Sequence, residues 1–183
     1  MRRYPMTLSG GVKALSAFIS ALVLSVPLLV WGVVPGVRLG PGGEVSRWLV
    51  LLAPALVLGC WALSPAAVEL EGGELRILRR AWRATAWPLA GVESAEVLPP
   101  GWLNGALRTA GNGGLFGFYG WYFKKGPFRL FATRRGPLVQ VVVEGRRVVV
   151  SPDAPLDLVA GLQATAPRLR QAAGGAASAS ARS

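Results

Sequence analysis

The first third of the chain carries two long apolar runs. Ala14 to Val34 contains no charged side chain, and its 21 residues, at a rise of about 1.5 Å each, match the roughly 30 Å hydrocarbon core of a bilayer. The second run, Trp48 to Val68, is interrupted only by small or weakly polar residues. Between them, Pro35 to Arg47 is rich in Gly and Pro and predicts a short turn. The pattern therefore predicts a hairpin of two transmembrane helices, at about 12–34 and 48–66.

Basic residues flank the two apolar runs unevenly. They lie before the first run and after the second, with fewer in the connecting segment. Because Lys and Arg are retained on the cytoplasmic side, we predict a multi-pass protein of the cell inner (cytoplasmic) membrane with both termini cytoplasmic. A signal peptide is the alternative, since Arg2, Arg3 and Lys13 precede an apolar stretch. That stretch exceeds the about 7 to 15 residues expected and no small-x-small cleavage site follows, which disfavours the alternative.

After the second run, short stretches separated by turn residues predict β-strands. Val68 to Glu71 and Glu74 to Arg80 should form a hairpin, because Gly72 and Gly73 supply the positive φ angles of a tight turn. Further strands are predicted at 83–89, 116–123, 128–133, 139–144 and 147–151, and 92–98 is either a short strand or a helical turn.

The pattern changes once more near the end of the chain. Ser151 or Asp153 can cap a helix, and Leu156, Val159 and Leu162 recur at a spacing of three on one face. One amphipathic helix is therefore predicted to close the β-rich unit. The last residues are Ala, Gly and Ser with few others, a composition that predicts a disordered tail.

This order, about seven short strands followed by one helix, is that of a pleckstrin-homology-like barrel. Together with the segments Arg108–Phe123, Phe128–Thr133 and Val148–Pro155, it resembles the bacterial PH domains found behind transmembrane helices in uncharacterised membrane proteins. GlyAsnGlyGlyLeuPheGly, at 111–117, is the most specific part, and the resemblance covers about Ala67 to Leu162.

The resemblance implies an α+β chain in which two N-terminal transmembrane helices precede a mainly-β PH-like barrel of about seven strands, capped by one C-terminal helix. It carries over no catalytic residue. The predicted division is a membrane anchor at 1–66, the PH-like domain at 67–167 and the disordered tail at 168–183.

The composition of the chain excludes several kinds of functional site. The chain has 20 Lys and Arg against 9 Asp and Glu, and its net charge of +11 favours anionic surfaces such as phospholipid headgroups or nucleic acid. It has no histidine and one cysteine, Cys60, which excludes intramolecular disulfides, zinc sites with His or several Cys ligands, and triads with a His base. We therefore expect no enzyme, no cofactor and no metal site.

The candidate binding residues are basic side chains and a glycine-rich turn. Near an anionic surface each basic residue contributes about 1 kcal/mol of attraction, although the same charges could simply be solvated. The glycines at 111–114 could cradle a phosphate or form a tight turn, and the turn is favoured because no Lys-Ser or Lys-Thr follows. The candidates are Arg76, Arg79, Arg80, Arg83, Asn112, Gly113, Gly114, Lys124, Lys125 and Arg129.

The aromatic run at 116–123 has two interpretations. It could stack nucleic-acid bases, or its alternating residues could fill the interior of a small barrel, with Gly117 and Gly120 permitting sharp coiling. The second interpretation is favoured, and no nucleic-acid partner is expected.

The predicted function is that of a non-enzymatic integral membrane protein that presents a cytoplasmic PH-like domain for protein or anionic-lipid binding. The expected partners are membrane lipids and a protein partner or a second copy of the chain. The alternative is a structural or accessory subunit of a membrane protein complex, in which the small residues Ser16, Ala17, Ser20 and Ala21 permit helix contacts. A third, weaker alternative is an enzyme with an unrecognised site around a carboxylate.

Overall fold

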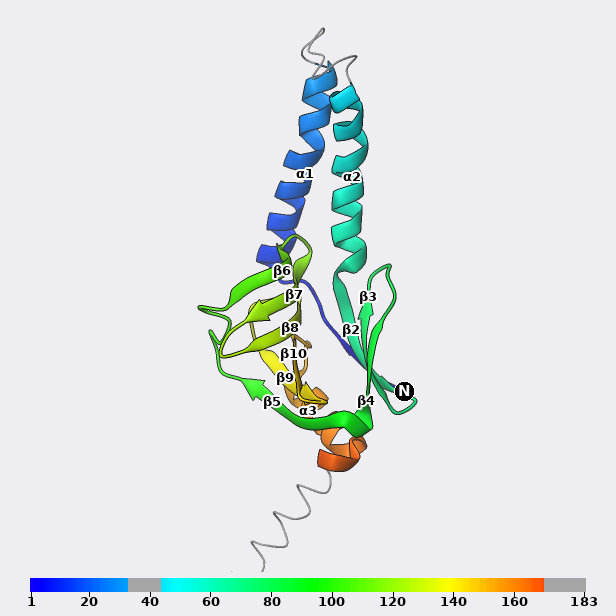
Figure 1. Ribbon diagram of the computed structural model, residues 1–183, viewed down its shortest axis with the longest axis vertical. Helices are drawn as coiled ribbons and strands as arrows, with labels where there is room; N and C mark the ends of the chain where they lie inside the picture. The colour runs from blue at the N-terminus through cyan, green and yellow to red at the C-terminus, as the bar shows by residue number, and fades with distance from the viewer. Residues whose placement is uncertain (33–43, 170–183) are drawn as a thin grey trace, which may run out of the picture.

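The computed structural model describes residues 1–32 and 44–169. The fold is α+β, with a four-stranded sheet, a six-stranded sheet and a hairpin of two helices that projects from one end of the β-rich part (Figure 1). Most of the predicted connecting turn at 35–47, and nearly all of the predicted tail at 168–183, lie outside the described residues.

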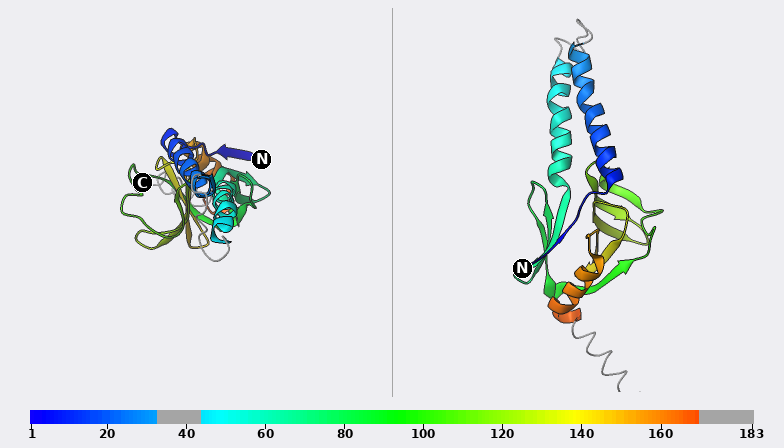
Figure 2. Two further views of the ribbon diagram at one scale, coloured as in Figure 1. Left: turned by 90° about the horizontal axis from the view of Figure 1, so that it is seen from above. Right: turned by 180° about the vertical axis from the view of Figure 1, so that it is seen from behind.

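The hairpin consists of α1, Gly10–Gly32, and α2, Glu44–Leu63, which pack side by side in both views of Figure 2 and in Figure 1. Within the described part of the chain, no helix is both long enough and apolar enough to cross a membrane. In α2, for example, the uncharged stretch after Arg47 ends with the helix at Leu63, after 16 residues (48 to 63), whereas a crossing needs about 20. This finding contradicts the predicted transmembrane helices, and with them the predicted multi-pass location in the inner membrane.

Helix α2 ends earlier than the apolar run does. Pro65 has no backbone N–H and disfavours helical geometry in the residue before it, Ser64, whose hydroxyl bonds the Trp61 carbonyl at 2.8 Å. The apolar residues that follow, such as Val68, belong to a strand and are buried in the core. The hydrophobic run from Trp48 to Val68 is therefore a helix followed by a strand.

The smaller sheet has the order β1-β2-β3-β4 and is antiparallel throughout. The predicted hairpin is confirmed as β2 and β3, joined by Gly72 and Gly73, which both have positive φ. Strand β1 was not predicted, and it lies in the predicted N-terminal flank. The strands are β1 (Arg2–Pro5), β2 (Pro65–Glu71), β3 (Glu74–Arg79) and β4 (Thr85–Pro88).

The larger sheet has the order β5-β9-β10-β8-β7-β6 and includes one parallel pair, β10 with β8. A single barrel of about seven strands was predicted, and the two separate sheets contradict it. A short 3-10 turn, Leu89–Gly91, connects the sheets, and 92–98 is a strand. The strands are β5 (Val92–Leu98), β6 (Leu107–Gly114), β7 (Gly117–Phe123), β8 (Pro127–Ala132), β9 (Leu138–Val143) and β10 (Arg146–Val150).

The main core lies where the inner faces of the two sheets meet helix α3, Pro155–Thr165. Leu158 and Leu162 of α3 are fully buried there and Val159 packs partly buried against the same core, whereas Leu156 is 72% exposed. The predicted face of Leu156, Val159 and Leu162 is therefore wrong at Leu156, and Leu158 is buried instead. The buried residues Leu158, Gly161 and Leu162 lie three and four positions apart, which places them on one helix face.

Neither predicted residue caps helix α3. Its first residue is preceded by Ala154, which makes no side-chain cap. Ser151 instead accepts a hydrogen bond from the backbone N–H of Thr133 at 2.8 Å, and Asp153 accepts bonds from Thr7 and pairs with Arg134 at 3.0 Å. Long-range partners therefore take both side chains away from the helix terminus.

A second, smaller core covers the other face of the larger sheet. Phe128, Leu130 and Tyr122 are buried there beneath the segment 99–106, which contributes Trp102 and Leu103. Because both faces of the sheet are covered, β7 and β8 have buried side chains at both odd and even positions.

Candidate functional site

Two of the predicted binding residues, both arginines from distant parts of the sequence, lie close together between the sheets. Arg79 ends β3 of the smaller sheet, and Arg129 lies in β8 of the larger sheet. The Cζ atoms of Arg79 and Arg129 lie 5.7 and 5.1 Å from the ring centroid of the same residue, Phe131. The candidate basic residues at 76–83 and those at 124–129 therefore each contribute one arginine to this place.

Strand alternation explains why these arginines face the interior. Leu75 and Ile77 of β3 are buried in the main core, and Arg79 is the next residue on the same face. On β8, Phe131 is in the main core, and Arg129 is two residues before it. The two guanidinium groups lie at the edge of the core, where the apolar pattern of both strands ends.

Indole rings surround Arg129. Its Cζ atom lies 5.3 Å from the ring centroid of Trp121 on β7 and 5.8 Å from that of Trp87 on β4. Trp87 in turn packs edge-on against Phe131, at 6.2 Å between centroids. Cation–π contacts of this kind hold a guanidinium in place and contribute about 0.5–2 kcal/mol each, but they leave its N–H groups without acceptors.

The site has positive charge without a carboxylate. In the described residues, ion pairs within 4.0 Å involve Arg76 and Arg134, and neither Arg79 nor Arg129 takes part in one. The Nε atoms of Arg79 and Arg129 are buried and have no hydrogen-bond partner in the described part of the chain. Arg79 Nη2 donates to Thr85 Oγ1 at 3.2 Å.

Burial disfavours the charged form of both side chains, and like charge adds to this effect at Arg129. Desolvation lowers the pKa of Arg79, with a smaller opposing effect from Tyr119. Desolvation also lowers the pKa of Arg129, and the positive charges of Arg79 and Arg146 lower it further. A nearby anion would reverse this effect, because it stabilises the guanidinium form.

A cavity of about 150 Å³ opens beside Arg129. Trp87, Trp121, Arg129 and Arg146 are among its lining residues. Arg147 also borders it, but its Nη2 donates to the carbonyls of Lys124 and Lys125 at 3.1 Å, so that side chain is already engaged. At about 30 Å³ for each water of liquid volume, the cavity has the volume of about five waters, enough for one small anionic group. We refer to Arg79, Arg129, Arg146, Trp87 and Trp121 as the arginine–tryptophan site.

The other basic residues of the predicted binding set lie outside the arginine–tryptophan site. Arg76 is on the outer face of the smaller sheet and pairs with Glu71 and Glu74 at 3.8 and 3.9 Å. Arg80 and Arg83 are exposed in the turn before β4. Lys124 donates to backbone carbonyls of the segment 99–106, including that of Asn104 at 2.8 Å, and Lys125 is exposed.

Asn112, Gly113 and Gly114 lie at the base of the helical hairpin, in β6. The Asn112 side chain bonds the backbone of Leu115 and donates to the Tyr119 hydroxyl at 3.0 Å. The Tyr119 hydroxyl donates to the carbonyl of Cys60 in α2 at 2.7 Å. The hydroxyl of Ser16 in α1 accepts from the backbone N–H of Phe116 at 2.7 Å. The segment with the most specific resemblance therefore joins the hairpin to the larger sheet.

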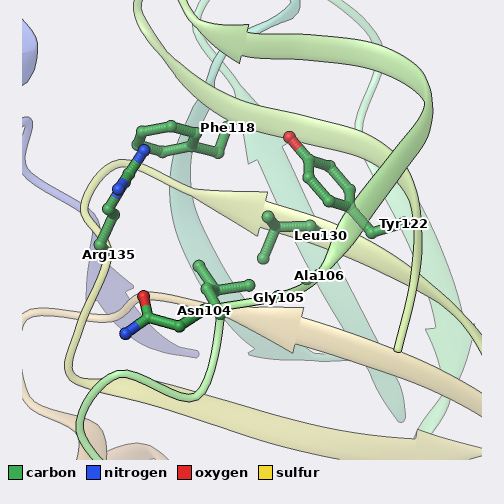
Figure 3. A pocket seen from close by; sticks show the side chains of 8 residues that line it. Asn104, Gly105, Ala106, Phe118, Tyr122, Leu130 and Arg135 are labelled. Atoms are coloured by element: carbon green, nitrogen blue, oxygen red, sulfur yellow. The ribbon is translucent and has the colours of Figure 1, made fainter. Parts of the chain in front are cut away.

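A second and larger cavity, of about 360 Å³, lies on the opposite face of the larger sheet (Figure 3). Leu130 forms part of its floor, with Phe118 and Tyr122 from β7 on one side. The Arg135 side chain extends toward the Phe118 ring, with 5.4 Å between its Cζ atom and the ring centroid. Asn104 lies on the other side of the cavity.

Sequence reasoning did not single out Arg146 and Trp87, and it did not place Trp121 beside Arg129. Alternation along β10 could have placed Arg146 on the same face as Val148. Its closeness to Arg129, however, depends on the parallel register of Val148 with Arg129, which no local pattern indicates.

Comparison with known proteins identifies no family for this chain. No protein-family model, curated protein or solved structure matches the chain. The resemblance to bacterial PH domains therefore stays a prediction.

Proposed function

We propose that this protein is a non-enzymatic binding module whose arginine–tryptophan site holds a phosphate group of a partner molecule. One observation carries the proposal: Arg79 and Arg129 come together between the sheets without a carboxylate in the described residues. Two partly desolvated positive charges that also repel each other raise the free energy of the empty site. A bound anion removes much of that penalty.

The chemistry of the site favours phosphate over a carboxylate. A phosphate monoester carries nearly two negative charges at pH 7 and offers three acceptor oxygens, which suits several guanidinium groups at once. The cavity of about 150 Å³ accommodates this group but not a whole nucleotide or lipid headgroup, so the rest of the ligand would extend outward past Arg146. Trp87 and Trp121 form apolar walls that exclude water and strengthen the charged hydrogen bonds.

Isothermal titration calorimetry on the full chain tests the proposal, with inorganic phosphate, glycerol 3-phosphate and a phosphoserine peptide as separate probes. All three should bind if phosphate itself is recognised. The probe with the highest affinity indicates which class of molecule carries the phosphate. A charged hydrogen bond contributes about 1.5–3 kcal/mol, so Arg129→Gln should weaken binding by about tenfold to a hundredfold.

The matched control is Arg83→Gln, which removes the same charge from an exposed position outside the site. Equal affinity in Arg129→Gln and Arg83→Gln would overturn the proposal, since the effect would then be one of net charge alone. Absence of binding by all three probes at millimolar concentration would also overturn it. Unfolding curves of each variant show whether a loss of binding reflects a loss of fold.

A second candidate function is that of an assembly subunit, and the surface of the hairpin favours it. Large apolar side chains are exposed along both helices, including Phe18 and Leu22 of α1 and Leu52 and Leu56 of α2, with exposed fractions between 55 and 68%. An apolar surface of this kind marks an interaction site, and here the proposed occupant is a pair of helices from a second copy, which would complete a four-helix arrangement. Ser16, in the predicted small-residue stripe, is already buried against the β6–β7 turn.

Sedimentation of the intact chain tests this second candidate. Leu52→Gln with Leu56→Gln should shift a dimer to monomer, whereas Leu156→Gln, at an equally exposed position on α3, should not. A monomeric wild-type chain would exclude self-assembly.

A further inference from the structure

The larger cavity shown in Figure 3 supports an inference that is independent of the arginine–tryptophan site. We infer that it binds a small amphipathic monocarboxylate, that is, an aromatic or branched apolar group that carries one carboxylate. The inference rests on an apolar floor, a single unpaired guanidinium at the rim and a volume of small-molecule size.

Apolar side chains form the floor and part of the walls, and polar groups contribute about as much of the lining surface. Leu130 is fully buried, and Phe118 and Ala106 are half-buried around the opening. These side chains belong to the smaller core, so the cavity is a recess in packed structure and not a gap between mobile surface groups. An apolar ligand group that enters it would bury its surface at about 25 cal/mol per Å².

The rim provides one positive charge. Arg135 forms neither an ion pair nor a hydrogen bond in the described part of the chain, and its guanidinium is held beside Phe118. Two N–H groups of one guanidinium match the two oxygens of one carboxylate. Asn104 is exposed across the opening and has a side-chain amide that can donate a further bond.

Tyr122 adds a polar atom whose donor capacity is already used. Its hydroxyl donates to the Asn112 carbonyl at 3.0 Å, so toward a ligand it acts as an acceptor. Burial raises the pKa of Tyr122, and the nearby charges of Arg108 and Arg135 partly oppose this effect. The hydroxyl therefore stays neutral at physiological pH and does not repel a carboxylate as a phenolate would.

Size and charge distinguish this cavity from the other site. Its volume of about 360 Å³ lies near the lower end of the roughly 300–1,000 Å³ range of small-molecule pockets. One guanidinium, that of Arg135, lines this cavity and can balance a monoanion, whereas those of Arg129, Arg146 and Arg147 line the smaller cavity of the arginine–tryptophan site. The segment 99–106, which forms one wall, accepts a hydrogen bond from Lys124 at the Asn104 carbonyl, and this bond ties the wall to the end of β7.

The test compares 3-phenylpropionate with its uncharged analogue, 3-phenylpropanamide, by calorimetry on the full chain. The acid should bind at least tenfold more tightly than the amide. Arg135→Gln should remove that preference while the amide still binds, and Ala106→Leu, which fills the recess, should weaken both ligands. Arg83→Gln is the charge-matched control and should change neither affinity.

Three results would overturn the inference. The first is equal binding of acid and amide to the wild-type chain, and the second is failure of both to bind at millimolar concentration. The third is loss of phenylpropionate binding in Arg129→Gln with retention in Arg135→Gln, which would assign the acid to the arginine–tryptophan site. A loss of stability in Ala106→Leu would show in its unfolding curve, and Arg135→Gln, at an exposed position, then decides the test.

Discussion

The hydroxyl of Tyr119 connects the helical hairpin to the larger sheet, and its removal should destabilise the protein measurably. It donates to the Cys60 carbonyl at 2.7 Å and accepts from the Asn112 side chain at 3.0 Å. Cys60 lies in the last turn of α2, where carbonyl groups have no partner within the helix. Tyr119→Phe keeps the buried ring and removes only the oxygen.

The magnitude follows from the groups left behind. An unpaired, buried polar group costs about 1–3 kcal/mol, so Tyr119→Phe should lower the free energy of unfolding by that amount. Equilibrium unfolding in urea, followed by tryptophan fluorescence, measures it. The midpoint should fall and the m-value should stay the same, because the surface exposed on unfolding does not change.

Two other tyrosines provide matched controls for the same substitution. Tyr122→Phe removes one hydrogen bond, to the Asn112 carbonyl, and should cost about 0.5–1.5 kcal/mol. The Tyr4 hydroxyl makes no hydrogen bond within the described residues, and Tyr4→Phe should change stability by less than about 0.5 kcal/mol. If Tyr119→Phe were no more costly than Tyr4→Phe, the connection would have no energetic role and the reasoning would be refuted.

Three further predictions concern the same part of the molecule. Burial raises the pKa of Tyr119 to about 12 from 10.0, so its contribution to stability is complete below pH 10 and is lost between pH 10 and 12. Urea unfolding across that range should show a decline that is smaller in Tyr119→Phe, in which Tyr122, whose pKa burial also raises, still contributes. Gly120→Ala should destabilise the chain by more than about 1 kcal/mol in the same assay, because φ is +134° and the new Cβ atom would meet the Ala110 carbonyl oxygen; Gly136→Ala, in open space, is the control. Ser16→Ala leaves the Phe116 N–H without its partner and should speed hydrogen exchange at that amide about tenfold or more, and unchanged exchange would contradict this role.

Local patterns predicted those features that depend on neighbours in the sequence. The Gly72-Gly73 turn and its two strands were correct, because the turn conformation and the alternation are both local. The prediction of a terminal helix was also correct, but its buried face was wrong at Leu156, since the spacing of apolar residues in Leu156 to Leu162 fits more than one face. The apolar runs predicted two neighbouring helices but not where the second one ends, because Pro65 ends α2 inside the second run.

Composition alone excluded classes of chemistry. A chain without histidine and with one cysteine cannot form a His-dependent triad or an intramolecular disulfide in any fold. The positive charge indicated an anionic partner but could not rank the individual arginines, because a side chain's solvation depends on what packs around it.

Only the tertiary structure decided which arginines lie close together. Arg79 and Arg129 are 50 residues apart (129 minus 79) and belong to different sheets, so their closeness depends on how the sheets pack and not on either strand. The same is true of Arg146, which reaches Arg129 through the parallel pairing of β8 and β10. Long-range packing places unpaired charges together only where surrounding contacts offset their repulsion. Whether those contacts form cannot be predicted from any periodicity in the sequence.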